Sequence, residues 1–485
     1  MPRPLDKLRQ VRLGKLEALK KVGVNPYPSK FEGSTQIERV REAKLGSKAR
    51  TAGRIAAWRS HGALVFADLV DSSGKIQILF QQNELPTASY KLLDFLDIGD
   101  FLGVSGETFK TQAGELTIKV ESFALLAKSL RPLPSKSGFK DIEERYRQRY
   151  ADLLANPETR EVFERRTKII RLLRRFMDEH GFFEVETPTL QPIYGGASAK
   201  PFVTHHNTLD TDFYLRISDE LYLKRMVVGG FEKVYEIGHV FRNEGIDRAH
   251  NPEFTMMEFY WAYASYEDLI KFSEEMISSV VKEVCGSLKV DYEGQKLDFT
   301  PPWPRKTYRQ LLQEATGIDI DKVKTEEALR EAVKEKKLKI GFGETHGYGD
   351  LCDKLYKEYI RPKIIQPTLV LDYPAEMIAL AKRKEEDPSK VASFQLLVNG
   401  AELIKAYNEL NDPLEQKERW EEEEKLGKKG LEEHMVTDED YIRALECGMP
   451  PTAGWGLGID RFVAILTGQP SLKDVILFPT LRPHA

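Results

Sequence analysis

The chain has few cysteines, little net charge and no long hydrophobic run among its 485 residues. Only Cys285, Cys352 and Cys447 occur, far apart and without a CxxC pair, so neither a disulfide framework nor a structural zinc site is supported. The formal net charge of -4 argues against a generally basic nucleic-acid binder. Any contact with RNA must therefore be made by local patches.

No apolar run reaches the length of a transmembrane helix, and the first residues lack the apolar core of a signal peptide. Together with the low cysteine content, this predicts a reduced, cytoplasmic setting. A chain of this length is too long for one average core, so we expect two or more domains.

Residues 1–48 form the first predicted segment, which is basic and helical. Leucines recur among lysines and arginines as in an amphipathic helix, while Asp6 and Glu17 interrupt the basic run and argue against a targeting peptide. We expect this helix to dock on the next domain or on nucleic-acid phosphates. A solvated packing helix without an RNA role is the alternative.

Residues 49–128 change to short strands separated by glycine-rich turns, with one helical stretch at 86–96. Five such strands match an OB-fold barrel, whose second and third strands commonly carry single-stranded nucleic acid. Phe66 and Gln77 are the candidates on those strands for stacking on a base and bonding to its edge. Either side chain could instead fill the barrel core.

A linker is predicted at residues 129–145, where prolines stand among small polar residues. The second domain follows at 146–485. Its Lys/Glu-rich helical stretches near 303–367 resemble the solvated helices of an insertion, to which we assign no chemistry.

The second domain opens with an amphipathic helix that leads into a short strand. Apolar residues recur at helical spacing through 169–177, Gly181 stands where a C-cap glycine would, and the strand at 182–185 follows. Such a helix needs a partner surface, which intrachain packing could also supply.

A polar hairpin is predicted around the loop at 245–252. With period two, Arg242 and Glu244 share one face of the first strand, and Glu258 and Tyr260 share one face of the second. These charges converge on one side of a sheet. They could form the solvated side of a surface sheet, but the flanking residues are too apolar for an edge hairpin in water.

A glycine-rich strand and a helix follow near the C-terminus. Gly454, Gly456 and Gly458 occur at alternate positions, so one strand face lacks side chains and a flat ring could lie on it. Asp460 is expected to cap the next helix, with Arg461 in its first turn facing the glycines. Close strand packing would explain the same glycines, and the spacing is not that of a dinucleotide-binding loop.

Three segments resemble the signature motifs of class II aminoacyl-tRNA synthetases, specifically of the lysyl-tRNA synthetase family. FFEVETPTL resembles motif 1, FRNEGIDRAHNPEFTMMEFY resembles motif 2, and GWGLGIDRFVAIL resembles motif 3, in that order along the chain. The resemblance implies an α+β protein: an N-terminal OB-fold that binds the anticodon, then a catalytic domain with an antiparallel sheet flanked by helices. It also implies a homodimer formed through motif 1.

The resemblance implies that lysine and ATP react on the catalytic domain. Arg242 would contact both the α-phosphate and the lysine carboxylate, because a planar fork can serve both. Phe254 and Arg461 would sandwich adenine. The remaining ATP-binding residues implied are Glu244, Arg248, His250, Asn251, Glu402, Gly456 and Gly458.

The resemblance also implies a lysine pocket in which acidic residues bind both ammonium groups of lysine. A substrate with a neutral side chain would leave the buried carboxylates unpaired. The residues implied are Gly196, Glu220, Glu258, Tyr260, Lys405, Tyr407 and Glu409. Lys405 departs from the asparagine usual in lysyl enzymes. We expect its ammonium to lie toward the substrate carboxylate and not on Glu409.

A magnesium site is implied on a second hairpin. Asn399 and Gly400 predict a two-residue turn that brings Gln395 and Glu402 onto one face. Both positions are commonly acidic in lysyl synthetases, where they bind Mg²⁺ with the ATP phosphates. Because Gln395 is neutral here, the site depends on Glu402.

The barrel is implied to recognise the anticodon of tRNA(Lys) through Arg54, Phe66 and Gln77. Three alternatives remain: an aspartyl or asparaginyl synthetase, a non-catalytic tRNA-binding paralogue, and a lysine ligase acting on a protein. The acidic pocket argues against the first, the intact arginines against the second, and the barrel against the third.

Overall fold

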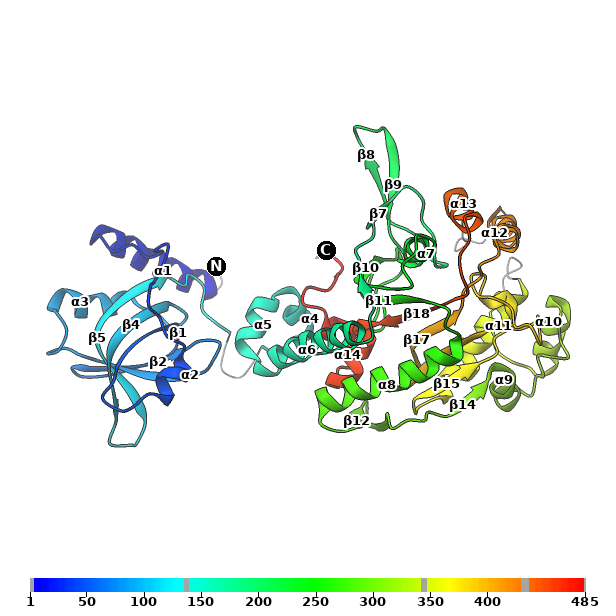
Figure 1. Cartoon of the computed structure of the whole chain (residues 1–485). Helices are drawn as coiled ribbons and strands as arrows, with labels where there is room; N and C mark the ends of the chain where they lie inside the picture. The colour runs from blue at the N-terminus through cyan, green and yellow to red at the C-terminus, as the bar shows by residue number, and fades with distance from the viewer. Residues whose placement is uncertain (1–3, 135–138, 342–346, 429–435, 484–485) are drawn as a thin grey trace. The chain divides into compact units, whose positions relative to one another are not determined.

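The computed structural model describes residues 4–134, 139–341, 347–428 and 436–483. The chain divides into two compact units (Figure 1). The first contains Met1–Lys140 with Tyr150–Asn156, and the second contains Asp141–Arg149 with Pro157–Ala485. The linker expected at 129–145 includes residues 135–138, which lie outside the described part. Among the described helices, none is both long and apolar enough to cross a membrane.

The first unit is built on a closed five-stranded barrel with the strand order β1-β2-β3-β5-β4. Its strands are β1 (Lys48–His61), β2 (Leu64–Val70), β3 (Lys75–Gln81), β4 (Phe101–Lys110) and β5 (Leu116–Ala127). Successive side chains of a strand point alternately into and out of the barrel, and the inward-pointing ones in its core include Val65, Ala67, Ile76 and Ile78. A short helix, α3 (Thr87–Lys91), and a 3₁₀ turn, η1 (Leu92–Phe95), connect β3 to β4. The predicted OB-fold is confirmed.

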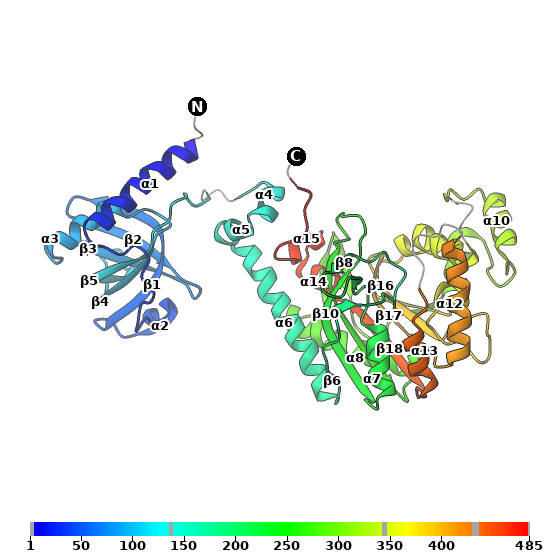
Figure 2. The ribbon, with the colours of Figure 1, turned by 90° about the horizontal axis from the view of Figure 1, so that it is seen from above.

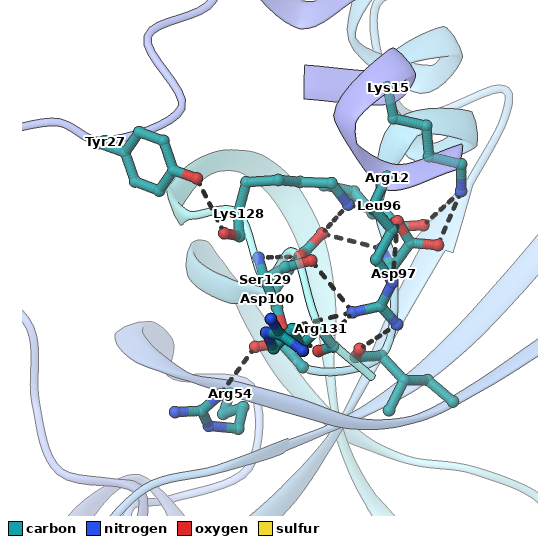
Figure 3. A network of polar contacts seen from close by, with 12 residues as sticks. Arg12, Lys15, Tyr27, Arg54, Leu96, Asp97, Asp100, Lys128, Ser129 and Arg131 are labelled. Atoms are coloured by element: carbon teal, nitrogen blue, oxygen red, sulfur yellow. Dashed lines mark hydrogen bonds and ion pairs between the residues drawn. The ribbon is translucent and has the colours of Figure 1, made fainter. Parts of the chain in front are cut away.

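The N-terminal helix α1 (Pro4–Lys21) docks on the barrel, one of the two arrangements expected for it (Figure 3). Arg12 donates to the carbonyl oxygens of Ile98, Ser129 and Arg131, each at 3.0 Å. Lys15 donates to Asp97 at 2.8 Å. Leu19 is buried in the barrel core. The shorter α2 (Ile37–Glu42) packs on the same barrel through two buried side chains.

Three helices lead to the main sheet: α4 (Ile142–Arg147), α5 (Arg149–Ala155) and α6 (Pro157–Glu179). Helix α6 ends as predicted, since Gly181 has a φ of +76° and the amide of Phe182 donates to the carbonyl of Met177. The strand that follows, β6 (Phe183–Glu184), is only two residues long and pairs in parallel with β10.

The second unit contains an eight-stranded sheet in the order β14-β15-β16-β17-β18-β11-β10-β6 (Figures 1 and 2). Its central pairs are antiparallel and only its two outermost pairs are parallel, which confirms the predicted antiparallel sheet. The strands besides β6 are β10 (Lys233–Phe241), β11 (Glu253–Ala262), β14 (Arg305–Thr307), β15 (Thr368–Leu371), β16 (Ser393–Val398), β17 (Ala401–Asn408) and β18 (Thr452–Gly458).

Helices cover the sheet on both faces. One face packs against α6, α8 (Tyr266–Cys285) and α14 (Ile459–Thr467) around a core that includes Phe259, Phe272 and Trp455. The other face packs against helices that include α7 (Glu220–Val228) and α13 (Glu439–Glu446). Tyr260 and Tyr407 belong to this second face, so the predicted site lies there.

The remaining elements of the second unit surround this framework. They are β7 (Leu190–Gln191), β8 (Val203–His206), β9 (Thr211–Leu215), β12 (Lys289–Tyr292), β13 (Gln295–Asp298), α9 (Tyr308–Thr316), α10 (Glu326–Glu335), α11 (Tyr348–Leu355), η2 (Tyr356–Ile360), η3 (Arg361–Lys363), η4 (Ala375–Met377), α12 (Pro413–Lys428) and α15 (Leu472–Val475). The segment 303–367 is mostly helical, but it also supplies β14 to the main sheet.

Candidate active site and nucleic-acid surface

The glycine strand β18 lies between β11 and β17 and forms the floor of the site. In register, Glu258 and Lys405 pair with Gly456 from either side, and Tyr260 and Tyr407 pair with Gly454. Neighbouring strands lie about 4.8 Å apart, so each row of side chains spans about 10 Å. Residues predicted from two separate hairpins therefore meet across a strip without side chains.

The space above Gly454 is filled by the chain itself, which corrects the expectation that all three glycines offer an open surface. A β-carbon on Gly454 would lie 1.9 Å from Oε1 of Glu409 and 2.6 Å from the ring of Tyr260. Above Gly456 the nearest atoms lie 3.5 Å away. Only Gly456 and Gly458 leave room for a ring, while Gly454 makes room for a carboxylate.

Helix α7 places Glu220 over the same floor. The hydroxyl of Tyr407 donates to Oε2 of Glu220 at 2.8 Å, and the hydroxyl of Ser218 donates to Oε1 of Glu258 at 3.0 Å. Gly196 has a φ of +86°, and a β-carbon there would lie 3.0 Å from Ser218. The structure thus brings the predicted residues of the lysine pocket together.

Sequence reasoning missed a cation in this pocket. The side chain of Lys224 is fully buried, and its ammonium lies 2.5 Å from Oε1 of Glu220 and forms an ion pair with Glu409. The signal was available, because Glu220 and Lys224 are four residues apart and four residues bring side chains onto one face of a helix. Ser218 was also missed.

Burial and mutual repulsion shift the acids of the pocket. Burial, with the charge of Glu220, raises the pKa of Glu258 to about 7. Burial also raises the pKa of Glu409, and the ammonium of Lys224 opposes that rise. Burial alone would lower the pKa of Lys224, but the charges of Glu220 and Glu409 outweigh it and raise this pKa. The pocket therefore attracts a second cation.

Arg242 lies just beyond the end of β10 and not on the strand, and Glu244 follows it in the connection. The backbone amide of Arg242 still donates to the carbonyl of Pro252 at 2.8 Å, so the hydrogen bonding of the hairpin continues one residue beyond the strand. Its guanidinium lies 5.2 Å from the ring centre of Phe254 and, through Nε, 3.4 Å from the carbonyl oxygen of Ile217. Ile217 adjoins Ser218, whose hydroxyl bonds to Glu258, so Arg242 lies beside the pocket. The charge of Arg242 acts to lower the pKa of Glu258.

Arg461 is half-buried at the start of α14, where it donates to the carbonyl oxygen of Glu402 at 3.1 Å. Burial lowers its pKa, and the charges of Glu402, Arg242 and Glu244 act on it. A β-carbon on Gly458 would lie 3.8 Å from the Arg461 side chain, so Arg461 stands beside the glycine strand.

Asp460 does not cap α14, contrary to the prediction, because the N-cap residue is Gly458. The Asp460 carboxylate turns away from the helix end. It accepts from the amide of Thr255 at 2.9 Å and forms an ion pair with Arg166 of α6. This fixes the start of β11 against α14.

The three residues predicted to hold terminal phosphates occupy different settings in the loop 245–252. Arg248 is exposed and pairs with Glu293 at 3.0 Å, and His250 is exposed beside Asp247. Asn251 is buried, with its amide group bonded to the carbonyl of Glu253 and the amide of Thr480. Arg248 and His250 are therefore open to solvent, whereas Asn251 has a structural contact on each side of its amide.

The outer face of the barrel carries the residues predicted to read bases. Because Val65 and Ala67 point inward, Phe66 points outward and is half-buried. Gln77 accepts from Arg59 at 3.0 Å and donates to Thr117 at 2.8 Å. One amide hydrogen and one lone pair of Gln77 remain for a base edge.

Arg54 and a pocket complete this surface. Arg54 stacks over Phe101 at 4.2 Å and donates to the carbonyl of Gly99 at 3.0 Å. A pocket of about 450 Å³ adjoins Gln77, with Arg41 and Lys75 among its lining residues. Aromatic, amide and cationic groups thus lie on one barrel, as single-stranded nucleic acid requires.

Comparison with known proteins agrees with this geometry. Residues 141–482 match the family described as tRNA synthetases class II (D, K and N). The chain belongs to this family. Residues 49–126 of this class II synthetase match the OB-fold nucleic acid binding domain. The α+β fold implied by the resemblance is confirmed.

Relatives of this synthetase match over almost the whole length of both chains. The lysine–tRNA ligase of Carboxydothermus hydrogenoformans is 50% identical over 99% of this chain and 99% of its own. That of Syntrophomonas wolfei is 49% identical over 99% and 98%, respectively. That of Dehalococcoides mccartyi strain 195 is 47% identical over 99% and 98%, respectively.

The expected magnesium site of the synthetase has one acidic residue. The turn at Asn399 and Gly400 forms as predicted, yet the amide oxygen of Gln395 already accepts from the hydroxyls of Tyr356 and Tyr373, at 2.8 and 3.1 Å. The described residues include no group of three or more His, Cys, Asp or Glu placed to hold a metal. The residues present therefore fit an ion held mainly by ATP phosphates, with Glu402 as its one anionic protein ligand.

Proposed function

We propose that this synthetase activates L-lysine with ATP, forming lysyl-adenylate and pyrophosphate, and then transfers lysine to the 3′ end of tRNA(Lys) in the cytoplasm. The observation that carries the proposal is the buried row of acids and phenols beside Arg242. Glu258 and Glu409 lie on either side of the glycine strand, within reach of one ammonium group. A neutral or acidic side chain would leave them unpaired, which argues against aspartate and asparagine.

The lysine side chain enters between Glu258, Tyr260 and Glu409. Oε1 of Glu409 is buried and has no hydrogen-bond partner among the described residues, so it is the acceptor left for the ε-ammonium. Glu220 and the backbone near Gly196 receive the α-ammonium. The carboxylate then points toward Arg242.

In the first step, a carboxylate oxygen of lysine attacks the α-phosphorus of ATP, and the bond to the bridging oxygen of pyrophosphate breaks. Both reactants are anionic, so the arginine fork lowers the barrier by binding both and holding them in line. Glu402 would help to hold a magnesium ion on the ATP phosphates, where the ion would supply positive charge. No protein nucleophile is required.

In the second step, a hydroxyl of the terminal tRNA ribose attacks the lysyl carbonyl, and AMP leaves. Orientation is the main requirement of this step. The barrel selects the tRNA, with Phe66 stacking on an anticodon base, Gln77 bonding to its edge and Arg54 contacting a neighbouring base or phosphate. Stacking contributes about 1 to 3 kcal/mol per base.

Lys405 is assigned to the substrate carboxylate. It shares a row with Glu258 across Gly456, and its ammonium lies 5.9 Å from the ring of Tyr407. Within the described chain no acid pairs with it. Its free charge lies between the lysine pocket and the residues assigned to ATP.

The synthetase is proposed to act as a homodimer formed through the motif 1 region. The edge strand β6 exposes Phe183, with 57% of its surface accessible, and Phe183 packs against Phe231 at 5.3 Å between ring centres. Exposed aromatic pairs on a sheet edge favour association. Light scattering of the purified protein measures its mass, and the mass of a single chain would contradict the proposal.

Pyrophosphate exchange with ATP and each of the twenty amino acids, with and without tRNA, tests the proposed function. Exchange is expected with lysine alone. Exchange with aspartate or asparagine would favour the related specificities, and no exchange with any amino acid would favour a non-catalytic tRNA-binding protein.

A further inference from the structure

Lys224 is the one fully buried lysine in the described part of the acidic pocket, and the proposed function gives it no task. It lies on α7, one turn after Glu220, and its ammonium bridges Glu220 and Glu409. The rings of Tyr260 and Tyr407 flank it at 6.0 and 5.8 Å. It therefore has the surroundings that the ε-ammonium of a substrate would have.

The groups that face Lys224 come from every element packed around it. They are Glu220 of α7, Tyr260 of β11, Tyr407 of β17, Glu409 just after β17, and Tyr441 of α13. Two carboxylates thus share one buried protein cation, and Glu258 interacts electrostatically with both of them. Without that cation, buried carboxylates at this spacing would take up protons instead of staying ionised.

We propose that Lys224 is a positioning and specificity-determining residue: it keeps Glu409 ionised and oriented toward Gly454, so that the pocket accepts only a side chain that brings a second positive charge. The inference rests on the proposed lysine pocket. Lys224 occupies one oxygen of Glu409 and leaves Oε1 for the substrate. It also fixes Glu220, whose other oxygen is held by Tyr407.

This arrangement gives selectivity through charge balance. The ion pair with Lys224 stabilises the negative charge of Glu409, and that charge is matched best by a cationic side chain. Lys224 acts to lower the pKa of Glu409, against burial and the nearby carboxylates, which raise it. Without the charge of Lys224 those raising effects act unopposed, so Glu409 is protonated and neutral in the empty pocket up to a higher pH. A neutral analogue such as norleucine then loses less binding free energy in the pocket, because it leaves no charged carboxylate unpaired. Lysine must displace a proton from Glu409 to bind.

The test compares Lys224→Met, which keeps the length of the side chain and removes its charge, with Lys224→Arg, which keeps the charge. Arg225→Met is the matched control, because Arg225 is the next residue of α7 and contacts Asp438 and the ring of Tyr441, with no ion pair to Glu220 or Glu409 among the described residues. Pyrophosphate exchange is measured for lysine and norleucine across about pH 6 to 9.

In Lys224→Met, the KM for lysine is expected to rise by about 30-fold or more at neutral pH, with a smaller change in kcat. The penalty should shrink as the pH rises, and the preference for lysine over norleucine should fall. Lys224→Arg should retain part of this preference. Arg225→Met should keep the wild-type preference for lysine over norleucine and its wild-type pH dependence, because it leaves the charges of Lys224 and Glu409 in place.

A loss of equal size at every pH, with an unchanged preference for lysine, would overturn the inference and leave Lys224 as a packing residue. If Lys224→Met does not fold, the double variant Lys224→Met/Glu409→Gln removes both charges together. The KM for lysine in this double variant should be close to that of Glu409→Gln alone. A KM far above that of Glu409→Gln would also overturn the inference. Failure of the wild type to exchange with lysine would instead refute the proposed function.

Discussion

Gly454 lies directly beneath Glu409, so close that a β-carbon at 454 would stand 1.9 Å from Oε1 of that carboxylate. The carboxylate can reach the pocket only because its neighbour on β18 has no side chain. The alternating glycines therefore have two separate uses. Gly454 makes room for the carboxylate of Glu409 in the proposed lysine pocket, and Gly456 and Gly458 leave the open strand face on which we propose that the adenine of ATP lies.

Replacing these glycines should separate the two substrates. Gly454→Ala displaces Glu409 and is expected to raise the KM for lysine by about tenfold or more while the KM for ATP changes little. In Gly456→Ala the new methyl group meets its nearest atom only at 3.5 Å, so the pocket is kept and the KM for ATP should rise instead. Steady-state pyrophosphate exchange measures both constants. Equal effects on both substrates in both variants would contradict this division.

Lysine binding should depend on pH through Glu258. Burial raises the pKa of this carboxyl to about 7 in the free pocket, and the incoming ammonium stabilises the ionised form. The carboxyl is protonated below that pKa, so the KM for lysine should fall by about tenfold between pH 6 and 8. Glu258→Gln should raise the KM and flatten the profile. A KM that stays constant over this range in the wild type would contradict the assignment.

Lys405 should act on the substrate carboxylate. Lys405→Asn removes a charge that has no acidic partner in the described chain, and the KM for lysine is expected to rise about five- to tenfold, with no loss of stability. Thermal unfolding controls for stability. If the KM for lysine were unchanged, the assignment of Lys405 to the carboxylate would be abandoned.

The fold and most of the site could be predicted because their signals are local. Alternating apolar residues revealed the barrel strands, Gly181 marked the end of α6, and Asn399 with Gly400 set the turn of a hairpin. The meeting of Glu258 with Lys405 across Gly456 was not predicted, since it depends on the order and register of three strands that are far apart in the sequence.

The sequence misled where tertiary contacts outweigh local preference. Asp460 stands where a cap residue would, but a bond to Thr255 and an ion pair with Arg166 hold it elsewhere. Lys224 looks like one half of an exposed helical ion pair, and only the fold shows that β17 brings Glu409 against it. Neither contact has a signature in nearby sequence.

The barrel surface should matter for tRNA and not for activation. Phe66→Ala and Gln77→Ala each remove a group proposed to contact the anticodon, so the KM for tRNA(Lys) should rise about 5- to 100-fold. Pyrophosphate exchange without tRNA should be unchanged. Ala67 points into the core, so Ala67→Ser is a control for barrel integrity, expected to lower the melting temperature without this specific effect on tRNA.

Helix α1 should stabilise the barrel through Asp97. Burial alone would raise the pKa of Asp97, but hydrogen bonds from Lys128 and Lys15 outweigh it and lower this pKa. A folded pKa below the unfolded value means that the stabilisation is present above the unfolded value of about 3.9 and is lost as the pH falls through the folded pKa. Asp97→Asn should therefore lower the melting temperature at neutral pH and have little effect near pH 2. Among the residues that the structure describes, Lys20 pairs only with the exposed Glu17. Lys20→Ala is therefore the matched control and should leave the melting temperature unchanged at both pH values. If Asp97→Asn lowered the melting temperature equally at neutral pH and near pH 2, the charge of the carboxylate would not be what holds the helix.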